Sequence, residues 1–410
     1  MSLDRRSFVR GLSATATLPG VAGCAGLLGP QGRSYPVEPH PPGKRRLVLC
    51  LDGSLAKTDD ATNIDWIAAN CQGAEARPIP QLVAYFPGVG TQPGEELLGG
   101  GLGFGLARQI KDGYHFIQAN WQRGDQIFIF GFSRGAYASR SLASFIGLLG
   151  WIEDPELASM AYEKWYRIQG ERDPMLRRLL QDSIEKITAE KPIPMEIDFL
   201  GVFDTVAALG FSNIDLPPVL REVSQIVSYS IDGFHRVHVG PHVRRVCHAV
   251  ALDEMLAHFS PTLLGPVPDE VIAREVWFAG GHGDVGGGHI GSEDNRNLAK
   301  VALVWMMEMA RAAGLELEPQ AWKRLRRQAD PLAPQHYAPP NISPEIASAL
   351  SLLKPRAPRL VPDGATVDTS VIERLHKPVE YRGIDGLPAP RQPYEPRNLP
   401  PTYARMAGAA

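Results

Sequence analysis

Residues 127–138 of the chain read IFIFGFSRGAYA. The first four residues are apolar and two of them are β-branched, which predicts a buried strand running directly into a Gly-x-Ser-x-Gly motif. Small residues with a helical pattern follow, so we expect a sharp strand-to-helix turn with Ser133 at its apex. Gly131 and Gly135 suit this turn because the strand, the serine backbone and the helix approach too closely for a Cβ atom. Ser133 is therefore a candidate nucleophile, and the alternative is a serine that only caps the helix.

Composition limits the classes to which the protein can belong. The 410 residues, 44% of them hydrophobic, suffice for one large α/β domain with extensions. A formal net charge of −3 gives no electrostatic case for nucleic-acid binding. The basic cluster Lys323–Arg327 has helical spacing, and we interpret it as the solvated face of a helix. The four cysteines lack zinc-type spacing, so we expect neither a structural metal nor a disulfide.

An export signal is predicted over residues 1–24. The twin arginines Arg5 and Arg6 precede a weakly hydrophobic run that is too short and too small-sided for a stable membrane-spanning helix. Val21–Ala25 then resembles a lipobox, in which Cys24 is acylated. We expect an exported bacterial protein, held by acyl chains on the periplasmic side of a membrane. The alternative is an apolar N-terminus with a chance arginine pair and an ordinary cysteine.

The remaining chain divides by composition into a linker, a domain and an extension. Residues 25–44 are rich in proline and glycine, which is typical of a linker. Over residues 45–328 apolar strands alternate with helical segments, and this pattern favours a mostly parallel sheet with helices on both faces. Of the 36 prolines, 15 lie in the last 80 residues. We therefore expect residues 329–410 to form a proline-rich extension of short elements packed on the domain.

Apolar segments of strand length are expected to complete the sheet at residues 45–51, 82–86, 195–203, 248–252 and 275–279. Helical periodicity predicts helices over residues 106–121 and 295–313. The stretch Gly99–Gly105 is expected to be a flexible loop, because no strand immediately precedes it. Residues 155–187 are mostly helical, and we interpret their aromatic side chains as core packing, with a lid over the site as the alternative.

A serine hydroxyl becomes a good nucleophile only beside a histidine that takes its proton and an acid that orients this histidine. In α/β-hydrolases these groups follow in the order serine, acid, histidine, each after a strand. Asp204 and His282 both directly follow apolar strands downstream of Ser133. We therefore predict the catalytic triad Ser133, Asp204 and His282.

Other residues compete for these roles. Asp198 is expected inside a strand, and His248 lies in a core strand, where a structural role is more usual. His289 follows a glycine run and is a weaker competitor to His282. Asp284 either supports His282 or belongs to a metal site. Such an oxygen-rich site, the chemical alternative to a nucleophilic serine, would consist of Asp52, Asp204, His282 and Asp284.

An acyl-transfer site also needs N–H donors for the oxyanion that develops. The backbone N–H of Arg134 supplies one of them through the geometry of the turn. Gly53 or Ser54, after the first strand of the domain, is the candidate for the second. Asp52 is then interpreted as a turn residue, and we expect no cofactor.

Six ordered blocks between about residues 45 and 315 resemble one known family. They are LDGS at 51–54, YFPGVGT at 85–91, GFSRGA at 131–136, GVFDTV at 201–206, HAVALDE at 248–254 and WFAGGHGDVGGG at 277–288. The chain is identified as a member of an α/β-hydrolase family of domains of unknown function. This family includes the catalytic domain of type VI secretion phospholipase effectors.

The resemblance implies an α/β-hydrolase fold and an activity similar to that of phospholipases A. The family triad falls on Ser133, Asp204 and His282, while Ser54 and His289 replace the usual threonine and tyrosine. We expect a serine esterase that acts on a lipid or other ester at a membrane surface. The alternatives are a metal-dependent hydrolase and a non-catalytic surface lipoprotein that keeps the fold.

Overall fold

The computed structural model describes most of the chain between residues 45 and 403. The described ranges are 45–53, 62–71, 79–88, 101–171, 173–189, 192–206, 237–256, 259–288, 296–336, 358–383, 387–400 and 402–403. The predicted signal and linker lie outside these ranges, as do Cys24, Ser54 and His289.

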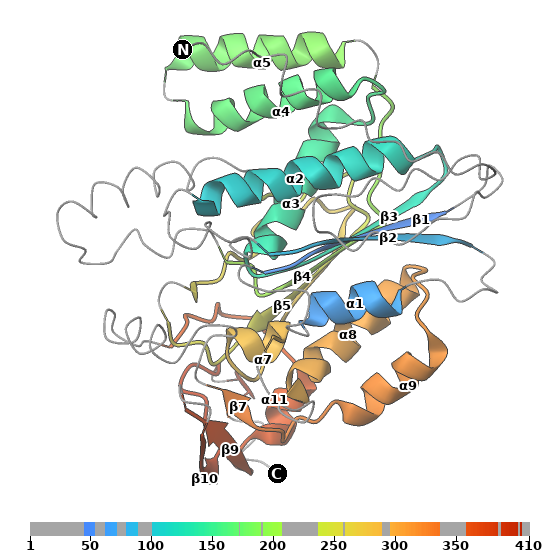
Figure 1. Cartoon of the computed structure of the whole chain (residues 1–410). Helices are drawn as coiled ribbons and strands as arrows, with labels where there is room; N and C mark the ends of the chain where they lie inside the picture. The colour runs from blue at the N-terminus through green and yellow to red at the C-terminus, as the bar shows by residue number, and fades with distance from the viewer. Residues whose placement is uncertain are drawn as a thin grey trace, which may run out of the picture.

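A seven-stranded sheet forms the centre of the described chain, and all neighbouring strands in it are parallel (Figure 1). In spatial order its strands are β2 (Gln81–Phe86), β1 (Arg46–Leu51), β3 (Gln126–Phe132), β4 (Phe199–Phe203), β5 (Arg245–Ala251), β6 (Ile272–Phe278) and β8 (Thr366–Val367). The strand order reverses at β1, which lies between β2 and β3. A crevice outside the carboxyl ends of the strands at such a reversal is the usual ligand site of α/β sheets. Asp52 and Ser133 directly follow β1 and β3, so the sheet brings both to this edge.

Helices cover both faces of the sheet because its central strands are apolar on both sides. In β1, for example, Leu49 packs into one core and Cys50 into the other. One face carries α2 (Gly101–Asn120) and α3 (Arg134–Leu149), with α4 (Pro155–Gly170) and α5 (Pro174–Thr188) outside them (Figure 1). The opposite face carries α1 (Asn63–Asn70), α8 (Ala299–Ala312) and α9 (Pro319–Gln328). The predicted α/β fold with helices on both faces is confirmed.

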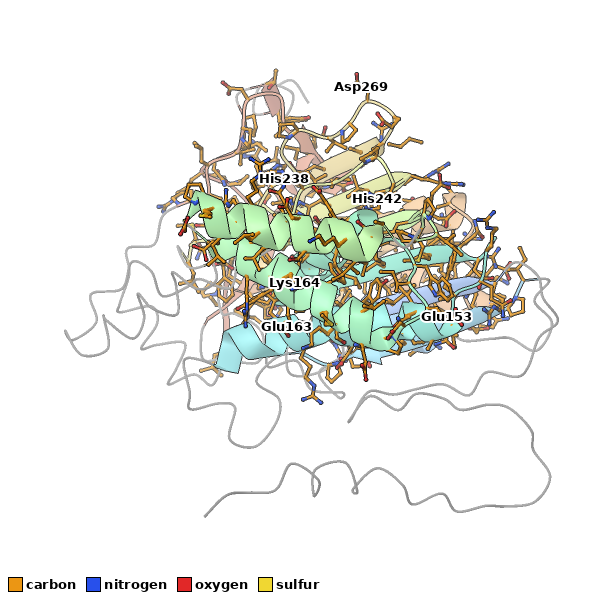
Figure 2. All side chains as sticks on the ribbon, turned by 90° about the horizontal axis from the view of Figure 1, so that it is seen from above. Glu153, Glu163, Lys164, His238, His242 and Asp269 are labelled. Atoms are coloured by element: carbon orange, nitrogen blue, oxygen red, sulfur yellow. The ribbon has the colours of Figure 1, made fainter. Side chains whose placement is uncertain are left out.

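The helical insertion α4–α5 packs on this assembly through aromatic side chains. Tyr162 and Trp165 of α4 are 2% and 3% exposed, and their rings lie 5.4 and 5.3 Å from that of Phe145 in α3. Figure 2 looks down on the two helices, with Glu163 and Lys164 labelled on α4. The interpretation of these aromatic residues as core packing is confirmed.

The C-terminal extension joins the main sheet, since β8 pairs with β6. It also supplies a three-stranded sheet of β10 (Pro388–Pro393), β9 (Pro378–Arg382) and β7 (Gln335–His336). The short helix α11 (Thr369–Arg374) carries the buried Arg374, which donates to the carbonyls of Pro331 and Ala333. Short elements packed on the domain were predicted, but a strand in its central sheet was not.

Two local predictions are wrong. α2 begins at Gly101, so most of the expected loop Gly99–Gly105 is helix despite the low helix propensity of glycine. The strand expected over residues 195–203 begins only after Asp198. The carboxylate of Asp198 instead accepts a hydrogen bond from the N–H of Ile127, 2.9 Å away, at the amino end of β3.

Three further observations concern the described residues. Cys50, Cys71 and Cys247 are buried. The basic residues of the cluster 323–327 are exposed on α9 around the buried Leu325. In the ranges that the structure describes, no helix is both long enough and apolar enough to cross a membrane.

Candidate active site

Ser133 occupies a strained turn between β3 and α3. Its φ and ψ angles are 57° and −124°, a conformation that L residues rarely adopt and that costs about 1–3 kcal/mol. A Cβ on Gly131 would lie 2.4 Å from Oγ of Ser139, and one on Gly135 would lie 2.3 Å from the carbonyl oxygen of Leu51. Both glycines of the motif are therefore required by close backbone packing, as predicted.

The structure brings the three predicted triad residues together. Nε2 of His282 lies 2.8 Å from Oγ of Ser133, and Nδ1 lies 2.5 Å from Oδ2 of Asp204. All three side chains are nearly inaccessible to solvent, because each stands at the carboxyl end of a buried strand or at the start of the following turn. A hydroxyl, an imidazole and a carboxylate linked in this order can move a proton from the serine to the histidine.

The imidazole of His282 is fixed on both faces and through its backbone. The rings of Phe132 and Phe259 lie 4.7 and 4.5 Å from it, at interplanar angles of 33° and 24°. The backbone N–H of His282 donates to Glu254, 3.0 Å away. His282 begins the short helix α7 (His282–Gly286). The ring therefore has little freedom to leave the line between Ser133 and Asp204.

Asp204 has the second strained backbone of the site, with a φ of 39°. Its Oδ1 accepts from the N–H of Ala251 at 2.9 Å. The guanidinium of Arg359 donates to Oδ1 and Oδ2 at 2.6 and 2.8 Å. Burial opposes ionisation of this carboxyl, but Arg359 and His282 outweigh it and hold the pKa of Asp204 well below its usual range. Asp204 is therefore an ionised, fully hydrogen-bonded acid.

Of the two predicted oxyanion donors, the structure leaves the N–H of Arg134 available and engages that of Gly53. Arg134 is the first residue of α3, and in the described part of the chain no acceptor is present for its N–H. Helix N-termini favour negative charge, so this position suits an oxyanion. The N–H of Gly53, in contrast, donates to Oδ1 of Asp52 at 2.7 Å. In this geometry Gly53 has no N–H left for an oxyanion, and the prediction for Gly53 is not supported.

Asp52 is more than the turn residue that we expected. Its Oδ2 accepts from the hydroxyls of Thr62 and Tyr85, each 2.6 Å away, in addition to the bond from Gly53. Burial raises the pKa of Asp52 to about 7, and the three hydrogen bonds only partly oppose this shift. Asp52 thus links β1, β2 and the start of α1 at the carboxyl edge of the sheet.

His248 has a structural role. It lies inside β5, its Nε2 accepts from the N–H of Thr205 at 3.1 Å, and its Nδ1 lies 2.9 Å from Glu275. Burial lowers its pKa. Both ring nitrogens are therefore engaged, and His248 fixes the backbone next to Asp204.

Asp284 binds the backbone before α7 and a residue of the C-terminal extension. Its carboxylate accepts from the N–H of Gly281 at 3.1 Å and from the backbone N–H of His336 at 3.0 Å, and it lies 2.8 Å from Nδ1 of His336. Of the four residues of the alternative metal site, Asp204 pairs with His282, while Asp52 and Asp284 have other hydrogen-bond partners. Among the described residues, no three His, Cys, Asp or Glu side chains gather as a set of metal ligands.

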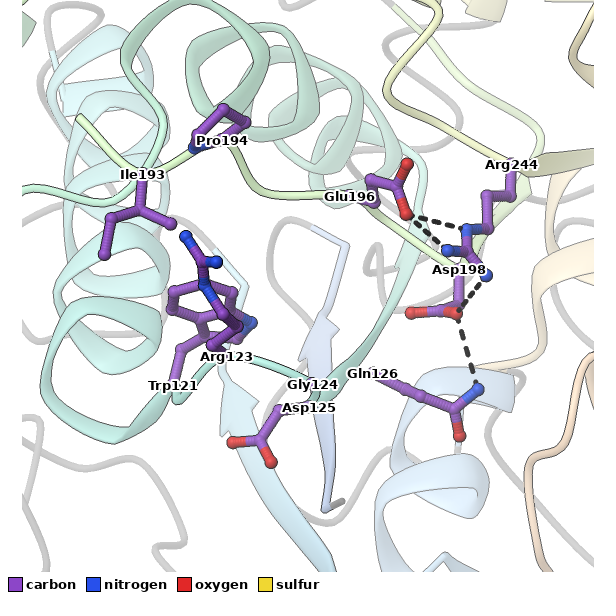
Figure 3. Close-up of a pocket in the computed structure, with 10 residues that line it drawn as sticks. All are labelled: Trp121, Arg123, Gly124, Asp125, Gln126, Ile193, Pro194, Glu196, Asp198 and Arg244. Atoms are coloured by element: carbon purple, nitrogen blue, oxygen red, sulfur yellow. Dashed lines mark hydrogen bonds and ion pairs between the residues drawn. The ribbon is translucent and has the colours of Figure 1, made fainter. Parts of the chain in front are cut away.

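A cavity of about 410 Å³ lies at the opposite, amino edge of the sheet (Figure 3). Its wall includes Arg244, which pairs with Glu196 and with Asp198 at 3.6 Å, and Asp198 also contacts Gln126. Opposite charges here neutralise each other, and none of the predicted site residues lines the cavity. We assign it no function.

Three residues that support the site were not singled out from the sequence: Glu254, His336 and Arg359. Glu254 belongs to the block HAVALDE, so its position near the site was within reach of the family resemblance. His336 and Arg359 lie in the proline-rich C-terminal extension, where no local pattern marks them.

Residues 45–309 match the family described as "T6SS, Phospholipase effector Tle1-like, catalytic domain". The chain belongs to this family. The Tle1-like match contains the serine, the acid and the histidine but ends before His336 and Arg359.

Among curated proteins, the chain is similar to the uncharacterized protein YEL023C of Saccharomyces cerevisiae, with 27% identity over 258 residues. The match covers 58% of this Tle1-like chain and 35% of the yeast protein, so the chain spans about a third of that relative. A solved structure of an uncharacterized protein from Pseudomonas aeruginosa is 17% identical, with a TM-score of 0.39 and coverage of 75% and 50% of the two chains. The Tle1 effector bound to the VgrG spike of the type 6 secretion system is 16% identical, with a TM-score of 0.43 and coverage of 79% and 83%.

Proposed function

We propose that this chain is a serine hydrolase that cleaves the carboxylic esters of lipids, with phospholipid as the favoured class. One observation carries the proposal: Ser133, on a strained turn, is linked through His282 to the ionised Asp204 by contacts of 2.8 and 2.5 Å. Membership in a phospholipase effector family supports the choice of a lipid ester.

The geometry supports a two-step reaction. Nε2 of His282 takes the hydroxyl proton while Oγ of Ser133 attacks the ester carbonyl carbon, and the N–H of Arg134 donates to the resulting oxyanion. His282 then gives the proton to the leaving alcohol, which leaves an acyl group on Ser133. Water, deprotonated by His282, attacks this acyl-enzyme, releases the fatty acid and restores the serine. Asp204 stabilises the imidazolium that forms in both steps.

An exposed apolar surface supports a substrate that lies in a bilayer. At the start of α5, Met175 and Leu179 are 74% and 53% exposed, next to the exposed Arg177 and Arg178. α4 runs antiparallel to α2, and the turn from α4 into α5 therefore lies toward the edge of the sheet that carries Ser133 (Figure 1). Apolar side chains flanked by arginines suit the interface of an anionic phospholipid membrane.

Vesicle binding tests this surface. A Met175→Ser, Leu179→Ser double variant should bind vesicles of anionic phospholipid at least about tenfold more weakly, since two apolar side chains no longer enter the interface. The matched control is Leu387→Ser, because Leu387 is 65% exposed in the extension. Equal binding by the double variant and wild type would remove this support.

We also propose that the protein is an exported bacterial lipoprotein, with Cys24 acylated and the domain on the periplasmic side of a membrane. The support is the order of twin arginines, apolar run and lipobox in residues 1–24. A Cys24→Ser variant should lose incorporated fatty acid and move to the soluble fraction. Unchanged fatty-acid incorporation would contradict this localisation.

A fluorophosphonate probe tests the nucleophile directly. The purified protein should be labelled at Ser133 with and without EDTA, and a folded Ser133→Ala variant should not be labelled. Turnover that is abolished by EDTA and kept by Ser133→Ala would favour the metal-dependent alternative. Absence of both labelling and ester turnover in a folded sample would favour a non-catalytic lipoprotein.

A further inference from the structure

Arg359 of the C-terminal extension contacts Asp204, the acid of the proposed triad. Its side chain is 5% exposed, and the side chain of its partner Asp204 is 0% exposed. The two contacts of 2.6 and 2.8 Å run to different carboxylate oxygens, which is the fork-to-fork arrangement of a strong charge-assisted pair. A surface ion pair has neither this burial nor this geometry.

The guanidinium also binds the backbone around the site. Nη1 donates to the carbonyl of Ala251 at 2.7 Å, and Nη2 donates to the carbonyl of Phe259. Phe259 is the residue whose ring stacks on His282. Arg359 therefore connects the acid on one side of the imidazole with the aromatic ring on its face.

Arg359 is itself held by the extension. Nδ2 of Asn398 donates to the carbonyl of Arg359 at 3.0 Å and to that of Leu252, just after β5, at 2.9 Å. Arg359 lies 50 positions beyond residue 309, where the family match ends. The extension thus places one buried positive charge against the acid of the domain.

The charges around Asp204 define what this pairing does. Besides Arg359, His282 faces the carboxylate through Nδ1, and His248 lies behind the adjacent backbone, itself paired with Glu275 and near Arg140. Of these groups only Arg359 contacts both carboxylate oxygens. A carboxylate buried without such a partner takes up a proton at higher pH, and a protonated acid no longer stabilises an imidazolium.

We propose that Arg359 is a positioning residue of the active site, and that the C-terminal extension completes the triad by keeping Asp204 ionised and aligned with His282. This role rests on the proposed function, since it acts through the triad. The extension then contributes a positioning residue that residues 45–309, the part matched by the family, do not contain.

Two substitutions separate this role from simple stabilisation. Arg359→Met removes the charge and both donors, and we expect kcat for a soluble p-nitrophenyl ester to fall about 10- to 100-fold, the range known for partners that orient metal-ligating histidines. KM should change less than about twofold, because Arg359 acts through Asp204 and not on the substrate. The acid limb of the kcat/KM profile, measured from pH 4 to 9, should move to higher pH as Asp204 becomes easier to protonate.

Arg359→Lys keeps the charge but loses the fork. We expect it to restore the acid limb toward that of wild type while recovering only part of kcat. Because Lys is the milder change, it keeps the test decisive if Arg359→Met does not fold, as judged by circular dichroism.

Arg374→Met is the matched control, because Arg374 is a second buried arginine of the extension with no contact to the triad. It should lower the unfolding midpoint and leave the pH profile unchanged. If wild type shows turnover that depends on Ser133, but the Arg359 variants keep the wild-type pH profile or match Arg374→Met, the positioning role is wrong and the proposed function stands. If wild type shows neither labelling nor turnover that depends on Ser133, both proposals fail.

Discussion

The Tle1-like domain and the C-terminal extension meet at Asp204 but contribute in different ways. The domain supplies the groups placed to react, each fixed at the carboxyl end of a parallel strand and two of them on strained backbone. The extension supplies Arg359 and His336, which contact Asp204 and Asp284 and do not reach Ser133. The residues at the strand ends thus determine which reaction is possible, while the later extension influences the ionisation of Asp204.

Asp204→Asn should have the largest effect. The loss of the charge that stabilises the imidazolium should lower kcat by about 10⁴-fold, as in other serine triads. It also leaves Arg359 buried without its counter-ion, which should lower the free energy of unfolding by about 3–5 kcal/mol. Steady-state kinetics and urea denaturation measure the two effects.

The double variant Asp204→Asn, Arg359→Met sharpens this comparison. Removal of both charges should recover much of the lost stability, since a missing buried pair costs less than one unpaired charge. Activity should stay at the level of Asp204→Asn. If instead the losses in the free energy of unfolding caused by the two single substitutions simply added in the double variant, the pair of Asp204 and Arg359 would contribute no coupling energy.

Tyr394→Phe tests a contact of the extension away from the triad. The hydroxyl of Tyr394 donates to Asp253 at 2.7 Å, next to β5, and its loss should lower the free energy of unfolding by about 1–2 kcal/mol. kcat and its pH dependence should not change, because Asp253 does not contact Ser133, His282 or Asp204. A shifted pH profile in this variant would show that the extension acts on the site as a whole and not through Arg359.

Much of this arrangement was predictable from the sequence, and the rest was not, for a physical reason. Parallel strands and the glycine-flanked turn impose local patterns, so the sheet, Ser133, Asp204 and His282 follow from short stretches of sequence. Arg359 reaches Asp204 across 155 residues, and a single buried arginine between prolines leaves no periodic signal. The prediction for Gly53 failed for a related reason, since only the three-dimensional structure shows that the Asp52 side chain folds back onto its N–H.

Asp52→Asn should produce the smallest change, in the pH dependence of stability. The pKa of Asp52 is raised from 3.8 to about 7 by burial, so between these values the folded state keeps a proton that the unfolded state releases. The free energy of unfolding therefore falls as pH rises through this window. In Asp52→Asn the free energy of unfolding should fall less with rising pH. Part of the remaining fall comes from Asp253, because burial raises the pKa of Asp253 to about 6. Urea denaturation at pH 4.5 and 7.5 measures the difference, and an unchanged slope would contradict the shifted pKa.

Trapping of the acyl-enzyme tests the central claim most directly. The protein is mixed with a p-nitrophenyl ester, quenched with acid during turnover and digested for mass spectrometry. We predict an acyl group on the peptide that contains Ser133, accumulating with a burst of p-nitrophenol and absent in Ser133→Ala. Sustained turnover with no adduct on Ser133, together with full activity of Ser133→Ala, would contradict the account.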